Sequence, residues 1–311
     1  MVLGIKTPFM TPLAIAFTPN YFVPAATMLK SLMDASTGEF RVVCLVSEEI
    51  PRRMQEKLER MGNGRLHFEY IPLKGRLEGL YIDPRYTEAA SFRLLLPELL
   101  PEYDKAIYID CDMIVRQDIG RLYRDTELGR NLLGAVYEAA IEGQAARFLA
   151  LGCDPARYFN SGFLLMNLAQ MRRENTSREL LEACRVPYLE FPDQDALNIV
   201  CKGRVLPLSP LYNSIRTFFI PKYKADFERQ YGNGLWEQVQ KEATIHYTGG
   251  KPWKMFTVRF RQWWQVYDSL HGEIKEEWTP DGRILRFWKL YRTAPCGCLI
   301  DGFRALKQKL A

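Results

Sequence analysis

Two aspartates at the end of an apolar run are the first residues whose types and spacing indicate chemistry. Residues 107–112 read Ile-Tyr-Ile-Asp-Cys-Asp, so one residue separates Asp110 from Asp112. In an extended backbone, residues i and i+2 point to the same side. Two carboxylates on one side repel each other unless a cation lies between them, and hard oxygen ligands favour Mg²⁺ or Mn²⁺. A polar turn after a strand is the alternative, because aspartate is a common turn residue.

A histidine in a second stretch is a third candidate ligand. Residues 243–253 read Ala-Thr-Ile-His-Tyr-Thr-Gly-Gly-Lys-Pro-Trp. Imidazole suits Mn²⁺. The glycines and Lys251 suit a diphosphate, through backbone N–H groups and a point charge. Taken alone, His246 is better explained as a structural histidine before a turn, but the adjoining glycines and lysine favour binding.

Two further polar stretches suit recognition of a sugar. Residues 158–168 read Tyr-Phe-Asn-Ser-Gly-Phe-Leu-Leu-Met-Asn-Leu, in which Asn160 offers a donor and an acceptor to sugar hydroxyls. Residues 193–198 read Asp-Gln-Asp-Ala-Leu-Asn, an acid and an amide at the expected start of a helix. Singly, the first is also compatible with a turn, and Asp193 with a helix N-cap.

Strands that alternate with helices must position these polar residues. Short runs rich in apolar residues predict strands at Leu13–Thr18, Phe40–Val46, Leu66–Pro72, Ala106–Ile109, Leu132–Tyr137 and Gly162–Leu168. Helical spacing predicts helices at Tyr21–Met33, Pro51–Met61, Glu88–Leu100, Ala169–Cys184, Asp193–Cys201 and Phe256–Leu270. Such alternation predicts an α/β fold with a mostly parallel, doubly wound central sheet flanked by helices. Ligands bind such sheets beyond the carboxyl ends of the strands, where the polar stretches lie.

The composition is that of a globular protein. Of 311 residues, 47% are hydrophobic and 25% are charged, so the chain can bury a substantial core. No apolar run approaches the ~18 residues of a membrane span, and the stretch from Met1 to Thr11 does not resemble a signal peptide. Five of the seven cysteines lie far apart, mostly inside apolar runs. They are typical of reduced thiols, and we expect a cytoplasmic protein.

The C-terminal part of the chain has its own charge pattern. From Arg283 onwards there are seven basic residues and one acid, Asp301, which gives this tail a charge of +6. The whole chain carries +5, so the remainder is close to neutral. We therefore divide the chain into a catalytic domain, residues 1–270, and a basic, aromatic, helical tail, residues 271–311.

Cations interleaved with Ile, Leu, Phe, Trp and Tyr favour contact of this tail with an anionic bilayer, at the inner face of the cytoplasmic membrane. The alternative is a basic helix whose aromatic side chains pack on the domain. No nucleic-acid-binding motif accompanies the charge, so we expect no nucleic-acid partner.

Together the four polar stretches resemble glycosyltransferase family 8, where they occur in the same order, and the resemblance runs from about Leu13 to Trp253. Asn20, Tyr21 and Arg93 fall in step with it. The resemblance implies a GT-A fold and a retaining transfer of a hexose, galactose or glucose, from a UDP-sugar. The acceptor would be a hydroxyl of lipopolysaccharide or of another cell-surface glycan, free or lipid-linked.

The resemblance also implies residue roles. Asp110, Asp112 and His246 would hold Mn²⁺, with Mg²⁺ as the substitute, and Gly249 and Lys251 would contact the diphosphate. The remaining donor-binding set would be Ala16, Thr18, Asn20, Arg93, Cys111, Asn160, Ser161, Asp193 and Gln194. The catalytic candidates are Gln194, Asp193 and Glu138; Glu138 falls where the family often has an acid beside the donor sugar.

The sequence departs from the family pattern in two places. Residues 17–20 read Phe-Thr-Pro-Asn where many relatives carry aspartates, one of which normally holds the uracil. The last motif is one residue shorter than in some relatives.

A metal-dependent nucleotide-diphosphate phosphohydrolase or nucleotidyltransferase is the alternative, but two-metal enzymes usually need more carboxylates. For the retaining step we favour front-face attack; Asp195 and Glu138 are the alternatives as a covalent nucleophile.

Overall fold

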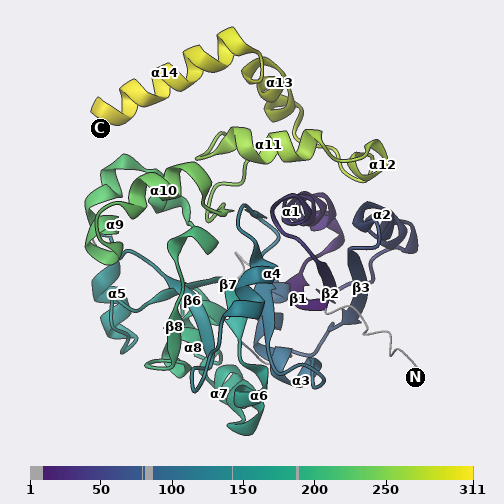
Figure 1. Cartoon of the computed structure of the whole chain (residues 1–311), viewed down its shortest axis with the longest axis vertical. Coiled ribbons are helices and arrows are strands. Elements are labelled where there is room, and N and C mark those ends of the chain that lie inside the picture. Colours follow the sequence, from purple (N-terminus) through teal and green to yellow (C-terminus); the bar gives the residue numbers. More distant parts are fainter. Residues whose placement is uncertain (1–9, 79, 81–86, 142, 187–188, 311) are drawn as a thin grey trace, which may run out of the picture.

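A seven-stranded sheet runs through the middle of the protein (Figure 1). The computed structural model describes residues 10–78, 80, 87–141, 143–186 and 189–310, without the side chains of 303–310. The strands of the sheet are, in chain order, β1 (Met10–Ala16), β2 (Glu39–Val46), β3 (Leu66–Pro72), β4 (Ala106–Ile109), β6 (Leu133–Tyr137), β7 (Phe159–Met166) and β8 (Val205–Pro207). They lie side by side in the order β3-β2-β1-β4-β7-β6-β8.

The predicted α/β fold with a mostly parallel sheet is confirmed. Strand β1 pairs in parallel with β2 and β4, β2 pairs in parallel with β3, and β6 with β8. Only β7 is antiparallel to its neighbours β4 and β6. The beginning of β7 therefore lies beside the carboxyl ends of β4 and β6, and residues from all three strands meet at one edge.

Alternate side chains of the central strands enter two separate cores. On β2, Val42 and Cys44 belong to one buried cluster, whereas Val43 and Leu45 belong to the other. A strand buried on both faces needs a continuous apolar run, which is why these strands could be predicted from the sequence. All seven cysteines are free and five of them are buried, as expected.

Helices cover both faces of the sheet (Figure 1). Side chains of the first core come from α1 (Phe22–Ala35), α2 (Arg52–Gly62), α4 (Ile119–Asp125), α9 (Lys224–Tyr231), α10 (Leu235–Glu242) and α11 (Phe260–Asp268). Side chains of the second come from η2 (Glu88–Leu95), α3 (Leu96–Leu99), α6 (Leu168–Arg173), α7 (Thr176–Ala183) and α8 (Pro192–Val200). The other helical segments of this part are α5 (Gln144–Ala150), η1 (Pro19–Tyr21), η3 (Pro210–Tyr212), η4 (Arg216–Phe219) and η5 (Pro221–Tyr223).

Three predicted helices need correction. The segment predicted as one helix at Glu88–Leu100 is the 3₁₀ helix η2 followed by the single turn α3. The predicted helix Ala169–Cys184 is broken into α6 and α7 at Asn175, whose φ of +57° is left-handed and cannot continue a right-handed helix. In the range Phe256–Leu270, the helix begins only at Phe260, after Arg259 with a φ of +50°.

The C-terminal segment lies against α11, at one end of the molecule (Figure 1). It consists of α12 (Gly272–Lys275), α13 (Gly282–Tyr291) and α14 (Ala294–Leu310). Trp288 of α13 is only 3% exposed and its ring stacks on Trp264 of α11, with centroids 5.9 Å apart. Among the described residues, no helix is long and apolar enough to cross a membrane.

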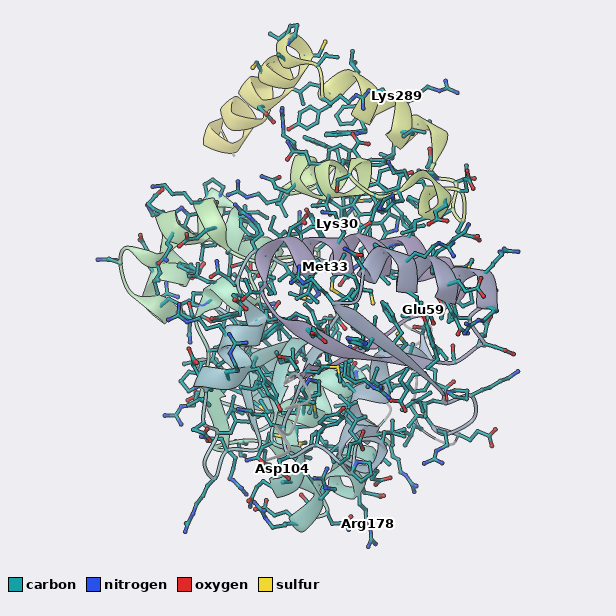
Figure 2. The ribbon with its side chains drawn as sticks, turned by 45° about the vertical axis from the view of Figure 1, so that its right-hand side comes forward. Lys30, Met33, Glu59, Asp104, Arg178 and Lys289 are labelled. Atoms are coloured by element: carbon teal, nitrogen blue, oxygen red, sulfur yellow. The ribbon has the colours of Figure 1, made fainter. Side chains whose placement is uncertain are left out.

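The cations of α13 point away from this packing. Arg283, Arg286 and Lys289 are exposed, and Figure 2 shows Lys289 at the opposite end of the molecule from Arg178 of α7. Leu290 is exposed as well. The aromatic residues thus pack on the domain while the cations face solvent, so features of both interpretations of the tail are present.

Candidate functional site

The predicted site residues converge because one end of each of four strands, β4, β5, β7 and β9, lies at the same place. Asp110 follows β4, and its N–H donates to the Gly162 carbonyl of β7 at 2.8 Å. The two-residue strands β5 (Met113–Ile114) and β9 (Ile245–His246) form a second, small sheet in which Met113 pairs with His246. This pairing brings His246 next to the two aspartates, although more than 130 residues of chain separate them.

Asp110, Asp112 and His246 form a compact cluster of potential metal ligands. One ligand atom of each lies within 4.8 Å of the others. The Nε2 atom of His246 is 3.3 Å from Asp112 Oδ1 and 3.7 Å from Asp110 Oδ2. Asp112 Oδ1 is buried and has no hydrogen-bond partner, which is costly unless a cation occupies the space in front of it. Two carboxylate oxygens and one imidazole nitrogen therefore fit a divalent metal.

Gly162 makes room for this cluster. A Cβ atom at this position would lie 2.2 Å from His246 Cε1 and 2.8 Å from Asp110 Oδ2. No residue with a side chain can take that place without displacing two of the three potential ligands. The glycine of the Asn-Ser-Gly stretch is thus explained by close packing, in addition to any role in a turn.

Lys251 adds a positive charge to the cluster. Its ammonium group donates to Asp112 Oδ2 and, at 2.8 Å, to the Tyr247 carbonyl. Burial works against the charge of Asp112, but Lys251 and His246 outweigh it and lower the pKa of Asp112 far below its usual range. Gly249, two residues before the lysine, has a φ of +82°, a conformation that favours glycine.

Arg93 links the metal cluster to the neighbouring polar pocket. Its buried guanidinium donates to Asp110 Oδ1 at 2.9 Å and to the Ser161 carbonyl at 2.5 Å, and Nε lies 3.2 Å from Asp193 Oδ2. Its guanidinium carbon lies 4.2 Å above the centre of the Tyr108 ring. Burial disfavours the charged form, but Asp110 and then Tyr108 and Asp193 outweigh it and raise the pKa of Arg93.

A cluster of buried polar side chains lies on the other side of Arg93. Gln194 Nε2 donates to Glu138 Oε1 at 3.2 Å, and Gln194 Oε1 accepts from Asn160 Nδ2 at 3.0 Å. Ser161 Oγ donates to Asp193 Oδ2 at 3.2 Å. Burial raises the pKa of both Glu138 and Asp193. The cluster therefore combines two desolvated acids with amide groups, which suits the hydroxyls and the developing positive charge of a sugar.

The residues expected at the nucleoside end lie on the β1 side of the cluster. Cys111 Sγ contacts the Ala16 carbonyl at 3.5 Å, which joins the ends of β4 and β1. Thr18 immediately precedes η1, and Asn20 is exposed within it. The adjacent Tyr21 ring meets Trp253 edge to face, with centroids 5.7 Å apart.

Several residues that the sequence analysis did not single out support the site. Asn213 contacts both His246 and Asn160. Tyr158 bonds to Gln194, and both Tyr158 and Arg147 bond to Asp195. Asn213 and Arg147 have no local sequence signal because their partners are distant in the chain.

Asp195 itself is fully engaged. It is 0% exposed. Its Oδ1 and Oδ2 each lie 3.0 Å from Arg147 Nη1, and Oδ1 also accepts from Tyr158 at 2.5 Å. This carboxylate is held by Arg147 of α5 and by Tyr158, which precedes β7, whereas Glu138 bonds to Asn160 and Gln194.

Comparison with known proteins gives a consistent family. The model of "Glycosyl transferase family 8" matches residues 12–257. General stress protein A of Bacillus subtilis is 31% identical over 55% of this chain and 61% of its own length. The lipopolysaccharide 1,2-glucosyltransferase of Escherichia coli is 28% identical over 60% of this chain and 52% of its own. The chain thus spans little more than half of these two relatives.

Solved structures show the same architecture. The galactosyltransferase LgtC, in complex with donor and acceptor sugar analogues, superposes with a TM-score of 0.68 at 25% identity, over 86% of this chain and all of that one. The bifunctional glycosyltransferase WbbM superposes with a TM-score of 0.71 at 21% identity, over 89% of this chain and 53% of that one. The fold is therefore the GT-A glycosyltransferase fold.

Proposed function

The chain belongs to glycosyltransferase family 8, and we propose that it moves a hexose from a UDP-sugar to a hydroxyl of a glycan acceptor with retention of configuration. The observation that carries the proposal is the Asp110–Asp112–His246 cluster, which adjoins a group of buried acids and amides. A nucleotide sugar needs this combination, because its diphosphate calls for cations and its hexose for hydrogen-bonding groups. The hexose is galactose or glucose, and the acceptor is lipopolysaccharide or another cell-surface glycan, free or lipid-linked.

The diphosphate would bind where the charges gather. Asp110, Asp112 and His246 would hold Mn²⁺, for which Mg²⁺ could substitute. When bound, this ion supplies Lewis-acid stabilisation of the negative charge on the departing UDP. Lys251 would leave Asp112 and turn to a phosphate oxygen, where its charge also favours departure. The bonds of Lys251 to Asp112 and to the Tyr247 carbonyl support this role, because they hold the ammonium group beside the cluster.

The hexose would bind in the pocket of Arg93, Asn160, Ser161, Asp193 and Gln194. We assign the catalytic contacts to Gln194, Asp193 and Glu138, since these groups border the place where the anomeric carbon acquires positive charge. The acceptor oxygen attacks from the side of the leaving group and forms the new bond to the anomeric carbon as the bond to phosphate breaks. The acceptor proton passes to the departing diphosphate, so the protein need not supply a base.

The nucleoside would lie beyond the metal, against Ala16, Thr18, Asn20 and Cys111. The contact between Cys111 and the Ala16 carbonyl supports this placement, because it forms a continuous wall next to Asp110 and Asp112. Thr18 has one hydroxyl for the base where relatives carry a carboxylate, so we expect a weaker preference for uracil than a carboxylate would give.

The experiment that tests this function is UDP release from a panel of UDP-sugars with Mn²⁺, comparing wild type with Asp112→Ala. We expect metal-dependent turnover of UDP-galactose or UDP-glucose, and a loss of about 10²- to 10³-fold in the variant. Release of UMP or inorganic phosphate in place of UDP would favour the phosphohydrolase or nucleotidyltransferase alternative. If no sugar turns over, calorimetric titration with UDP and Mn²⁺ decides, because absence of binding would sink the proposal.

We also propose that the basic tail, residues 271–311, holds the catalytic domain, residues 1–270, at the anionic inner face of the cytoplasmic membrane. The exposed Arg283, Arg286 and Lys289 and the exposed Leu290 support it, since cations beside apolar side chains suit an anionic interface. Trp288 and Tyr291 are buried in the protein, so the contact rests on the outer side of α13 alone. A lipid-linked acceptor would be reached from this position.

Vesicle sedimentation tests the membrane contact with a matched control. Reversal of Arg283, Arg286 and Lys289 to glutamate should abolish binding to vesicles that contain anionic lipid. The control reverses Arg173, Arg178 and Arg185, which changes the net charge by the same amount. These arginines are exposed on or next to α6 and α7, and Figure 2 shows Arg178 at the opposite end of the molecule from Lys289. Equal loss in both variants would mean that only the overall charge matters, and the tail would have no special role.

A further inference from the structure

Asn213 lies between the metal cluster and the sugar pocket. It is 0% exposed and follows η3, where the chain returns from β8. The next residue, Ser214, forms a bridge to Ile245, and its carbonyl accepts from the His246 N–H at 2.9 Å. The backbone thus fixes Asn213 against β9. Its side chain reaches two residues that are 33 and 53 positions away, His246 and Asn160.

The orientation of the Asn213 amide follows from its partners. Asn160 Oδ1 accepts from the Gly162 N–H at 3.1 Å, so this atom is an acceptor. It lies 3.0 Å from Asn213 Nδ2, and the Asn160 carbonyl, which can only accept, lies 3.4 Å from the same nitrogen. The nitrogen of Asn213 therefore faces Asn160, and its oxygen faces His246.

That orientation decides the tautomer of His246. Asn213 Oδ1 lies 3.0 Å from His246 Nδ1, and an amide oxygen can only accept. Nδ1 must therefore carry a hydrogen, so that whenever the ring is neutral its lone pair is on Nε2. Nε2 is the atom that faces Asp112 and Asp110. Asn213 thus selects the form of the ring in which the nitrogen on the metal side can act as a ligand.

The same amide also orients the sugar pocket. With Oδ1 of Asn160 held by Asn213 and by the Gly162 N–H, Nδ2 of Asn160 points to Gln194 Oε1 at 3.0 Å. The Ser161 N–H donates to the same Gln194 oxygen at 3.0 Å. The Gln194 nitrogen is then left to face Glu138 and Tyr158. Each amide thus donates to the next group, from Asn213 to Asn160, from Asn160 to Gln194 and from Gln194 to Glu138. A change at Asn213 therefore affects both the metal cluster and the sugar pocket.

We propose, on the basis of the function proposed above, that Asn213 is a positioning residue that holds His246 in its metal-binding tautomer and sets the direction of the Asn160 and Gln194 amides. Asn213→Ala removes both effects. Asn213→Asp separates them, because a carboxylate still accepts from His246 Nδ1 but cannot donate to Asn160. Asn198→Ala is the control for loss of a buried amide: Asn198 is 4% exposed, bonds to the backbone of Phe159 and to the Gln194 carbonyl, and touches neither His246 nor Asp110.

The first readout needs neither metal nor substrate. The chain has three histidines, so ¹⁵N labelling of histidine gives few signals, and His246→Ala identifies the one from the site. We expect wild type, Asn213→Asp and Asn198→Ala to show hydrogen on Nδ1. In Asn213→Ala the signal should shift towards a mixture of tautomers. A wild-type ring with its hydrogen on Nε2 would overturn the proposal, as would an unchanged signal in Asn213→Ala.

The second readout is Mn²⁺ affinity, which is measured from the electron paramagnetic resonance signal of the free ion. Asn213→Ala should bind about 10- to 100-fold more weakly than wild type, whereas Asn213→Asp and Asn198→Ala should keep the affinity. Asn213→Asp should instead lower kcat for the UDP-sugar by disturbing Asn160. If wild type bound no Mn²⁺, the proposed function would fail at the metal while the tautomer result stood. If wild type and Asn213→Ala bound it equally, only the role of Asn213 would be lost.

Discussion

The candidate site and the C-terminal aromatic segment are held together by different forces. In the site, buried charges lie against charges of opposite sign, as Arg93 does against both Asp110 and Asp193. In the segment, flat rings fill the space between α11 and α13, as Trp288 does on Trp264, and the cations remain outside. Directional bonds fix the place of each atom, whereas ring packing mainly excludes water. The first region can position reacting groups, and the second can attach a helix firmly while its outer side remains free to vary.

The largest effect expected on this comparison comes from removal of the buried cation. Arg93→Met leaves the carboxylates of Asp110 and Asp193 without their partner in a desolvated place, which should lower the free energy of unfolding by about 3–5 kcal/mol. Arg172→Met is the control, because Arg172 donates chiefly to backbone carbonyls. Urea denaturation measures both. A loss below about 1 kcal/mol for Arg93→Met would mean that charge matching does not hold the site together.

Removal of a ring from the other region should cost nearly as much but leave the site intact. Trp288→Ala removes a buried side chain that also donates from Nε1 to Asp268 at 3.0 Å, so we expect a loss of about 3–5 kcal/mol. Leu290→Ala, on the same helix but 53% exposed, should change stability by about 0.5 kcal/mol or less. The folded Trp288→Ala protein should bind Mn²⁺ as wild type does. Weaker binding would show that the two regions are coupled.

The difference between the regions also explains what could be predicted from the sequence. The strand predicted at Ala106–Ile109 matches β4, which is buried and continuously apolar. The strand predicted at Leu66–Pro72 matches β3, an edge strand in which His67 and Glu69 alternate with apolar residues. The short helices α9 and α10 were not predicted, since the chain after Pro207 has no regular spacing of apolar residues. The break at Asn175 was missed because asparagine is also compatible with an exposed helical position.

The site was predictable where its residues follow strands. Asp110 and His246 each end an apolar run. His246 lies outside the main sheet, but the pairing of β9 with β5 brings it to the end of β4, where Asp110 lies. Asn213 could not be found in this way, because it lies in an irregular segment and its partners are 33 and 53 residues away. The function of the tail could not be decided either, since the same residues supply both the buried rings and the exposed cations.

A smaller effect, confined to the site, is expected from the glycine that makes room for the metal ligands. Gly162→Ala places a methyl group 2.2 Å from His246 Cε1, so the ring must move and Mn²⁺ affinity should fall about 10- to 100-fold. Gly134→Ala in β6 is the control, because its Cβ would meet only the flexible end of Leu208, at 3.2 Å. Calorimetric titration with Mn²⁺ compares them. Equal affinities would mean that the cluster does not bind the ion through His246.

The smallest effect should distinguish the two regions by the sign of its pH dependence. Burial raises the pKa of Glu138 above its ordinary value of 4.5, so the folded protein binds a proton more tightly there than the unfolded chain does. Ionised Glu138 therefore destabilises the fold, and this penalty grows as the pH rises through the folded-state pKa. Glu138→Gln should match wild type near pH 4 and be relatively more stable near pH 8.

At Asp281, which begins α13 in the tail, the sign is reversed. The backbone N–H and then the side chain of Arg283 lower the pKa of this carboxyl, so its ionised form stabilises the fold. That contribution is present above the unfolded pKa and is lost as the pH falls through the folded one. Asp281→Asn should therefore be less stable than wild type near pH 8 and approach it at low pH. Thermal melting across this range gives the difference in Tm between each variant and wild type. With rising pH this difference should increase for Glu138→Gln and decrease for Asp281→Asn. Changes of the same sign would remove the distinction between the buried site and the exposed tail.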